Sequence, residues 1–125
     1  MDKGVEVEFR GDHISVKLKP NYAFDPSGRD EVWAEIKAAC KEHNSRRVLV
    51  EGVVPTGERE TADVVAAGQR TATVPHLWLA FHLDNFEATE QSELFEAIAA
   101  SRGVRVKFFV DREHALSWLR NNAPS

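Results

Sequence analysis

The sequence predicts one α/β domain with a mixed five-stranded sheet and four helices, in the order β-β-α-β-α-β-α-β-α. Near the N-terminus, apolar and polar residues alternate on both sides of a short turn, which is typical of a hairpin with one buried face. Residues 47–54 and 76–83 are two nearly continuous apolar runs, as expected for central strands covered on both faces. Segments with helical spacing of apolar residues separate the later strands, which favours parallel pairing after the hairpin.

The predicted hairpin consists of VEVEFR and HISVKLK, which flank Gly11 and Asp12. Valine and phenylalanine alternate with charged residues in the first segment, and isoleucine, valine and leucine alternate with serine and lysine in the second. Residues 20–30 (PNYAFDPSGRD) contain two prolines and a glycine, so this segment is expected to be a loop.

Two helices are expected in the first two-thirds of the chain, over residues 29–44 and 58–73. The first has an apolar stripe made of Val32, Trp33, Ile36, Ala39 and Cys40. The second is rich in alanine and glycine, which allow close packing but bury little apolar area. We therefore expect residues 58–73 to form the most labile helix, with faster hydrogen exchange than the others.

In the C-terminal third, the sequence predicts a helix, a strand and a final helix. Thr89 is the expected N-cap of the helix over residues 89–102, and Gly103 ends it. VRVKFFV is the last strand. Asp111 is the expected N-cap of the last helix, residues 111–122, which turns Ala115, Leu116 and Leu119 to the core, and the tail after it is expected to fray.

Composition restricts the function classes. The chain has 125 residues, which suits a single domain over 1–125, and a net charge of −4, which gives no electrostatic basis for nucleic-acid binding. Cys40 is the one cysteine, so no internal disulfide can form and a reducing, cytoplasmic location is expected. The N-terminus lacks the apolar core of a signal peptide, and no apolar run is long enough to span a membrane.

Two segments carry a resemblance to a known family: RVLVEGVV before the second helix, and the ending KFFVDREHALSWL. With this order of elements, they resemble STAS-type domains, and more narrowly the SpoIIAA-like, anti-sigma factor antagonist-like group. The resemblance covers almost the whole chain. It implies a non-enzymatic regulatory or binding module without a cofactor, whose partner is another protein or a small ligand.

The antagonists of this family carry Asp-Ser-Ser-Gly after the strand that VLVEG resembles, and a serine there is the phosphorylated switch. This sequence has Pro-Thr-Gly-Glu-Arg-Glu-Thr at the same place. Thr56 and Thr61 are the nearest hydroxyl residues, so a phospho-switch on one of these threonines is the alternative function. Both threonines are more simply explained as helix N-caps, since hydroxyl side chains are common at that position.

The candidate ligand or partner surface lies where the predicted parallel strands end, because ligands bind outside the carboxyl ends of such strands. Glu51 is the most informative member, since a carboxylate in an interior strand is rarely buried without a partner. It either orders the loop over residues 55–61 or faces a ligand, or else it forms a structural ion pair with Arg70 or a neighbouring arginine. The complete predicted surface is Glu51, Thr56, Gly57, Thr61, Asp84 and Phe86.

Catalysis and metal binding are not expected. The sequence contains no Gly-rich phosphate loop, nucleophile elbow or His-Glu-x-x-His pattern. His76 and His82 lie six residues apart around a strand and lack the spacing of a zinc site. Exposed aromatic residues in the flanking loops, Tyr22, Phe24 and Phe86, are instead candidates for a contact surface.

Overall fold

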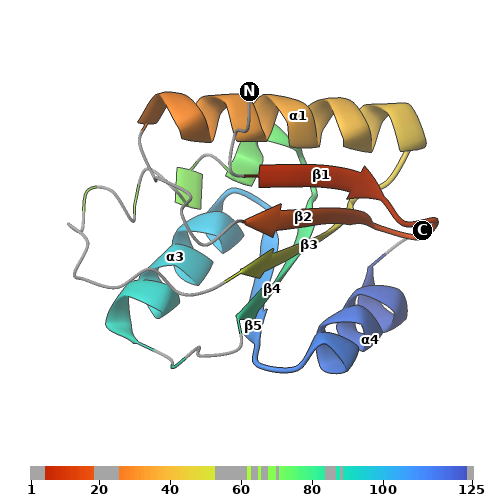
Figure 1. Cartoon of the computed structure of the whole chain (residues 1–125). Helices are drawn as coiled ribbons and strands as arrows, with labels where there is room; N and C mark the ends of the chain where they lie inside the picture. Colours follow the sequence, from red (N-terminus) through yellow and green to blue (C-terminus); the bar gives the residue numbers. More distant parts are fainter. Residues whose placement is uncertain are drawn as a thin grey trace.

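A computed structural model of the chain describes residues 5–18, 26–52, 62, 65, 68–69, 71–83, 87 and 89–123. Five strands form one sheet in the order β1-β2-β3-β4-β5. Strand β1 is antiparallel to β2, and β2, β3, β4 and β5 are parallel to one another. The predicted mixed five-stranded α/β sheet is therefore confirmed (Figure 1). The strands are β1 (Val5–Phe9), β2 (Ile14–Leu18), β3 (Arg47–Gly52), β4 (Trp78–Leu83) and β5 (Arg105–Phe109).

The helix count differs from the prediction, because the described residues form three α-helices rather than four. These are α1 (Pro26–His43), α3 (Glu90–Ser101) and α4 (Arg112–Asn122). Of the helix expected over residues 58–73, Ala62, Val65, Gly68 and Gln69 are helical, whereas Thr71–Thr73 form the 3-10 helix η1. The other residues of that segment lie outside the described residues.

Two predicted boundaries are wrong. Helix α1 begins at Pro26, so residues 26–30 are helical rather than part of a loop. Proline suits the first turn of a helix, because its fixed φ is helical and its missing N–H has no partner there anyway. Strand β4 begins at Trp78 rather than at residue 76, because His76 has a positive φ of 59° in the turn before the strand.

The helices lie on the two faces of the sheet (Figure 1). Helices α1 and α3 pack on one face, where Ile36, Cys40 and Ala99 join the main core cluster. Helix α4 packs on the other face, against Leu49 and Ala80. Strands added in one direction through right-handed crossovers bring their connecting helices to a single face, and the terminal helix α4 is free to cover the opposite one.

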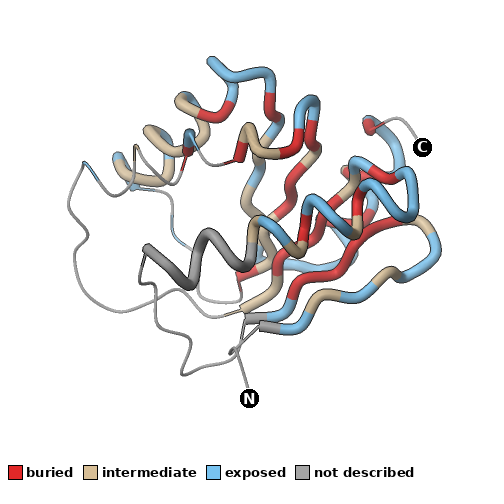
Figure 2. The backbone as a smooth tube through the Cα atoms, turned by 90° about the horizontal axis from the view of Figure 1, so that it is seen from above, coloured by how far each residue is buried: buried red, intermediate tan, exposed pale blue. Residues whose placement is uncertain are grey.

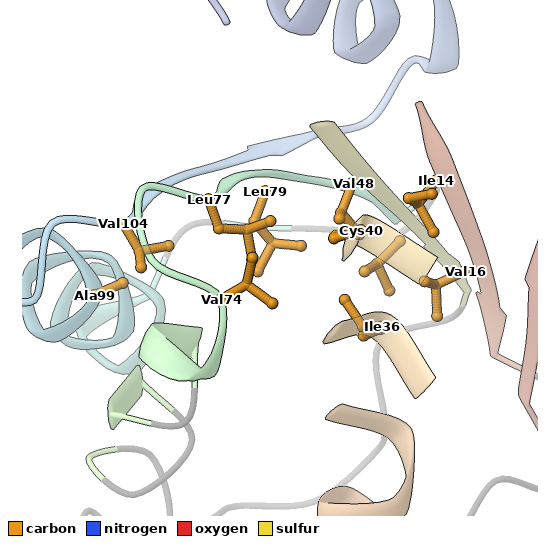
Figure 3. Packing of buried hydrophobic residues seen from close by; sticks show 11 residues of the cluster. Ile14, Val16, Ile36, Cys40, Val48, Val74, Leu77, Leu79, Ala99 and Val104 are labelled. Carbon is orange, nitrogen blue, oxygen red and sulfur yellow. The ribbon is translucent and has the colours of Figure 1, made fainter. Parts of the chain in front are cut away.

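The main core lies between the sheet and helices α1 and α3 (Figure 3). Figure 2 shows buried residues recurring along the strands, while the outer sides of the helices are exposed. The main core cluster consists of Ile14, Val16, Ile36, Cys40, Val48, Val50, Val74, Leu77, Leu79, Ala99 and Val104. The smaller cluster under α4 consists of Leu49, Ala80, Ala115, Leu116 and Leu119, which confirms the predicted core face of the last helix.

The predicted caps of α3 and α4 are confirmed. The Thr89 hydroxyl accepts a hydrogen bond from the Ser92 backbone N–H, and the Ser92 hydroxyl accepts one from the Thr89 N–H, which together form a capping box. Asp111 accepts a hydrogen bond from the Glu113 N–H. Gly103 follows α3 with a φ of 82°, the left-handed conformation that favours glycine at the end of a helix.

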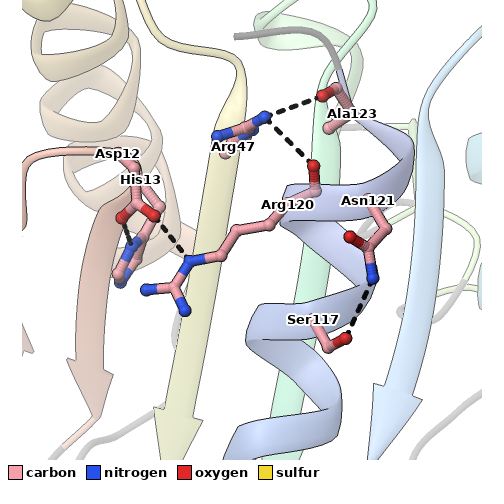
Figure 4. A network of polar contacts seen from close by, with 7 residues as sticks. All are labelled: Asp12, His13, Arg47, Ser117, Arg120, Asn121 and Ala123. Atoms are coloured by element: carbon pink, nitrogen blue, oxygen red, sulfur yellow. Dashed lines mark hydrogen bonds and ion pairs between the residues drawn. The ribbon is translucent and has the colours of Figure 1, made fainter.

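Polar contacts fix the C-terminal end of α4 to the sheet (Figure 4). Arg120 Nε donates a hydrogen bond to Asp12 Oδ2 at 2.6 Å, and the other oxygen of Asp12 lies 2.7 Å from Nδ1 of the buried His13. Arg47 Nη2 donates to the carbonyl of Ala123 at 2.9 Å. Ala123 is itself buried, so the expected fraying does not begin at this residue.

No described helix is both long and apolar enough to cross a membrane.

Candidate functional site

The candidate site lies at the carboxyl ends of β3 and β4, beside the start of α4. In parallel strands these ends meet at one edge of the sheet, which is where ligands bind in open α/β sheets. Glu51 is the second-to-last residue of β3, and His82 is its register partner on β4. Register partners in neighbouring strands have side chains on the same face. Both side chains therefore emerge on the face that α4 covers, as those of Leu49 and Ala80 do two residues earlier.

Glu51 and His82 form a close, mostly buried pair. His82 Nδ1 lies 2.9 Å from Glu51 Oε2, which is hydrogen-bond distance. The side chains are only 16% exposed for His82 and 17% exposed for Glu51, so water screens this contact weakly. The carboxylate thus fixes the orientation of the imidazole, because Nδ1 must carry the proton that Oε2 accepts.

Arg112 adds a positive charge to the pair from the first residue of α4. Its Nε lies 3.5 Å from Glu51 Oε2, and its side chain is 46% exposed. The N-cap Asp111 sets where α4 begins and so brings Arg112 to the end of the strands. Lys17 on β2 is the other register partner of Glu51, and its side chain is exposed. The carboxylate therefore has basic residues in its neighbouring strand positions on both sides.

One oxygen of Glu51 is left unsatisfied. His82 and Arg112 both approach Oε2, whereas Oε1 is buried and receives no hydrogen bond from the residues that the structure describes. An unsatisfied buried acceptor costs free energy, of the order of 1–3 kcal/mol for a polar group. The site therefore combines an exposed guanidinium donor with an unused acceptor, a pairing that suits recognition of a group carrying both an acceptor and a donor.

Within the described ranges, no group of three or more His, Cys, Asp or Glu side chains is placed to hold a metal ion. His76, which the sequence placed in the same strand as His82, lies in the turn at the opposite end of β4.

Of the predicted surface, the structure places Glu51 and leaves the rest undescribed. Thr56, Gly57, Thr61, Asp84 and Phe86 lie outside the described residues, as do Tyr22, Phe24 and Arg70. The expected ion pair of Glu51 with an arginine is present, and the arginine is Arg112.

Sequence reasoning did not identify His82 as the partner of Glu51. The signal was available in part, since both residues stand near the ends of the two apolar runs. Aligning RVLVEG with WLAFHL places Glu51 directly opposite His82. That alignment depends on the register, which the apolar pattern alone does not give when both faces of a strand are covered.

Comparison of the chain with models of protein families found no match, and comparisons with curated proteins and with solved structures found no significant match either.

Proposed function

We propose that the chain is a non-enzymatic, STAS-like regulatory or binding module that acts through the carboxyl ends of β3 and β4. The observation that carries the proposal is the half-satisfied carboxylate of Glu51, held between His82 and the exposed Arg112. Side chains that are kept in costly arrangements at the ligand-binding edge of an α/β sheet are candidates for function. The resemblance to regulatory modules, on RVLVEGVV and KFFVDREHALSWL, supports the same reading.

The partner proposed for this surface presents a hydrogen-bond donor and an acceptor close together. Arg112 would donate to the acceptor, and Glu51 would receive the donor after a small rotation of its carboxylate. A polypeptide backbone carries both groups in each peptide unit. We therefore favour a protein partner over a small ligand. A phospho-switch on Thr56 or Thr61 is the alternative function. We expect neither threonine to carry phosphate, and intact-mass spectrometry of protein from the native host would test this.

The experiment begins with the chain purified from its native host under mild conditions. Native mass spectrometry identifies the species that stays bound, and the complex is then rebuilt from purified components. Arg112→Ala is expected to weaken the complex about tenfold or more, since hydrogen bonds to charged groups contribute about 1.5–3 kcal/mol. Glu51→Gln, which keeps the shape and removes the charge, is expected to weaken it by a smaller factor.

The matched control is His114→Ala, which lies two residues from Arg112 on α4 and has a side chain that is 77% exposed. It should leave the affinity unchanged. If Arg112→Ala and His114→Ala behave alike, the partner does not use this edge of the sheet. Chemical conversion of the bound species by the purified chain would contradict a non-enzymatic module.

A further inference from the structure

A hollow of about 390 Å³ lies at the opposite ends of the strands, where β4 and β5 begin. It is lined by His76, Trp78, Ala100, Gly103 and Arg105. All of these residues except Trp78 are exposed, so the hollow opens to solvent. Its volume falls in the range of small-molecule sites, which begin at roughly 300 Å³. The proposed partner surface around Glu51 is at the other end of the strands, so the two sites are distinct.

Local backbone structure forms the hollow. The turn before β4 holds His76 at a φ of 59°, and the turn before β5 holds Gly103 at a φ of 82°. The Arg105 N–H donates a hydrogen bond to the carbonyl of Leu77 at 2.9 Å, which ties the two turns together. Ala100 and Gly103 carry minimal side chains, so the space between the turns stays open.

Arg105 is held in place by an aromatic side chain. Its guanidinium carbon lies 5.8 Å from the centre of the Trp78 ring, within the distance of a cation–π contact. Trp78 packs in turn against Trp118 of α4, with ring centres 5.4 Å apart. A guanidinium positioned in this way loses less conformational freedom on binding an anion than a freely rotating one.

Positive charge gathers around the hollow although the chain is acidic overall, with a net charge of −4. Arg46 donates a hydrogen bond to the carbonyl of Pro75, next to His76, and Arg102 precedes Gly103. No carboxylate among the described residues lies within ion-pair distance of Arg46, Arg102 or Arg105. Arg105 lines the hollow, while Arg46 and Arg102 lie beside the two turns that form it, and none of the three has an acidic partner among the described residues. This excess of positive charge favours an anionic occupant.

We propose that this hollow binds a small organic anion, a carboxylate or a phosphate monoester attached to a planar or apolar body. The forked guanidinium of Arg105 matches the two oxygens of either group, and the imidazole of His76 supplies a further N–H donor. The indole of Trp78 and the methyl group of Ala100 form the apolar wall for the body of the ligand.

Titration of ¹⁵N-labelled protein followed by NMR tests the proposal with four probes. Benzyl phosphate and phenylacetate carry the two anionic groups, and benzyl alcohol and phenylacetamide are their neutral counterparts. We expect at least one anion to shift the amide signals of Gly103 and Arg105 and the indole signal of Trp78 in a saturable way. The neutral probes should cause no saturable shift. The anion that binds more tightly tells whether the site prefers phosphate or carboxylate.

Variants locate the binding. Arg105→Ala should lower the affinity about tenfold or more, and Arg105→Lys should have an intermediate effect because lysine keeps the charge without the fork. Arg10→Ala is the matched control, since Arg10 is an exposed arginine that follows β1, at the other edge strand of the sheet. It should bind as the unaltered protein does.

Ala100→Glu provides a second test if Arg105→Ala disturbs folding as judged by circular dichroism. Ala100 is exposed near the end of α3, so the protein should still fold with a glutamate at this position. The new carboxylate would lie near Arg105 and compete with an anionic ligand for its guanidinium. This variant should lose anion binding. The proposal is overturned if neither anion gives saturable shifts, if the neutral probes bind as tightly, or if Arg10→Ala weakens binding as much as Arg105→Ala.

Discussion

Burial controls the chemistry of Cys40 at the scale of single residues. The side chain lies in the main core, and burial raises the pKa of its thiol to about 11, while the charge of Arg46 acts in the opposite direction. At pH 8 only about one thiol in a thousand is then the reactive thiolate, against roughly a quarter for a free cysteine. We expect Ellman's reagent to react with the native protein about two orders of magnitude more slowly than with protein in denaturant. Equal rates would mean that the core opens readily around Cys40.

Glu96 shows the same effect for a carboxylate, because its environment also disfavours the charged form. Burial raises the pKa of Glu96, the nearby charge of Glu93 raises it further, and Lys107 lowers it. A carboxyl whose folded pKa is raised destabilises the fold once it is ionised, so stability from this group falls as pH rises through that pKa.

Glu96→Gln removes this ionisation. We expect this variant to have a higher melting temperature at pH 7 and an unchanged one below about pH 4. The gain in the free energy of unfolding at pH 7 should be below about 1 kcal/mol, because the side chain is partly solvated. Thermal denaturation at both pH values is the measurement, with the exposed Glu87→Gln as control. An equal gain at both pH values would point to packing rather than charge.

At the scale of elements, Gly68 shows how closely the segment before η1 packs against α3. Gly68 is helical and buried, and a Cβ added there would lie 2.8 Å from both Cβ and Cγ2 of Ile98. It would also lie 3.3 Å from the Phe95 carbonyl oxygen. Real Cβ atoms essentially never approach another atom as closely as 2.8 Å, so the two elements must shift to accept a larger residue.

Gly68→Ala is therefore expected to destabilise the protein by about 1–3 kcal/mol, the usual cost of overpacking. A loss of stability would be diagnostic of the clash, because alanine in a helix is normally favoured over glycine by about 1 kcal/mol. Chemical denaturation would measure the change. Ile98→Ala removes Cγ2, one of the two Ile98 atoms in the clash, and keeps Cβ. Gly68→Ala combined with Ile98→Ala should therefore cost less than the sum of the two single changes. Additive effects would show that the contact with Cγ2 is not the cause.

The elements differ in how well the sequence predicts them. Period-two alternation and apolar runs locate all five strands, with ends that differ by up to about two residues, because a half-buried or fully buried strand imposes its pattern directly. The caps Thr89 and Asp111 are predicted for the same reason, since their hydroxyl and carboxylate have a local task. The start of α1 is misplaced because proline is both a turn residue and a first residue of helices.

The candidate site is predicted less completely than the elements. Glu51 is conspicuous as the one carboxylate of an apolar run, and Arg112 follows from the Asp111 cap. The link to His82 needs the register of β3 on β4, which is a tertiary property. The hollow beside Trp78 and Arg105 is invisible in the sequence, because it depends on how two turns from distant segments approach each other.

At the scale of the whole molecule, Asp12 connects the two ends of the described chain. It joins the hairpin turn to α4 through His13 and Arg120 (Figure 4). Burial alone would raise the pKa of Asp12, but the hydrogen bonds from His13 and Arg120 and their charges outweigh it and lower the pKa. A carboxyl group whose pKa is lower in the folded state stabilises the fold at pH values above its ordinary pKa of about 3.9. This stabilisation is lost as the pH falls through the folded-state pKa.

Asp12→Asn should therefore destabilise the protein at pH 7 and have little effect at the acid end of the titration. The loss is expected to stay below about 1 kcal/mol, because the carboxylate is 36% exposed and solvent screens its contacts. Denaturant unfolding at a series of pH values from 7 downwards measures it. A difference that persists undiminished at the lowest pH would mean that shape, rather than charge, makes the contact.

The strand order has a consequence for how the chain acquires its structure. Each strand pairs with the strand that precedes it in the sequence, and none is inserted between two others. Pairings between chain neighbours close shorter loops than pairings across the sequence, which lowers the entropic barrier to folding. During synthesis, each new strand leaving the ribosome can therefore dock on an edge that has already formed. The last strand and α4 then complete the molecule without any earlier pairing having to open.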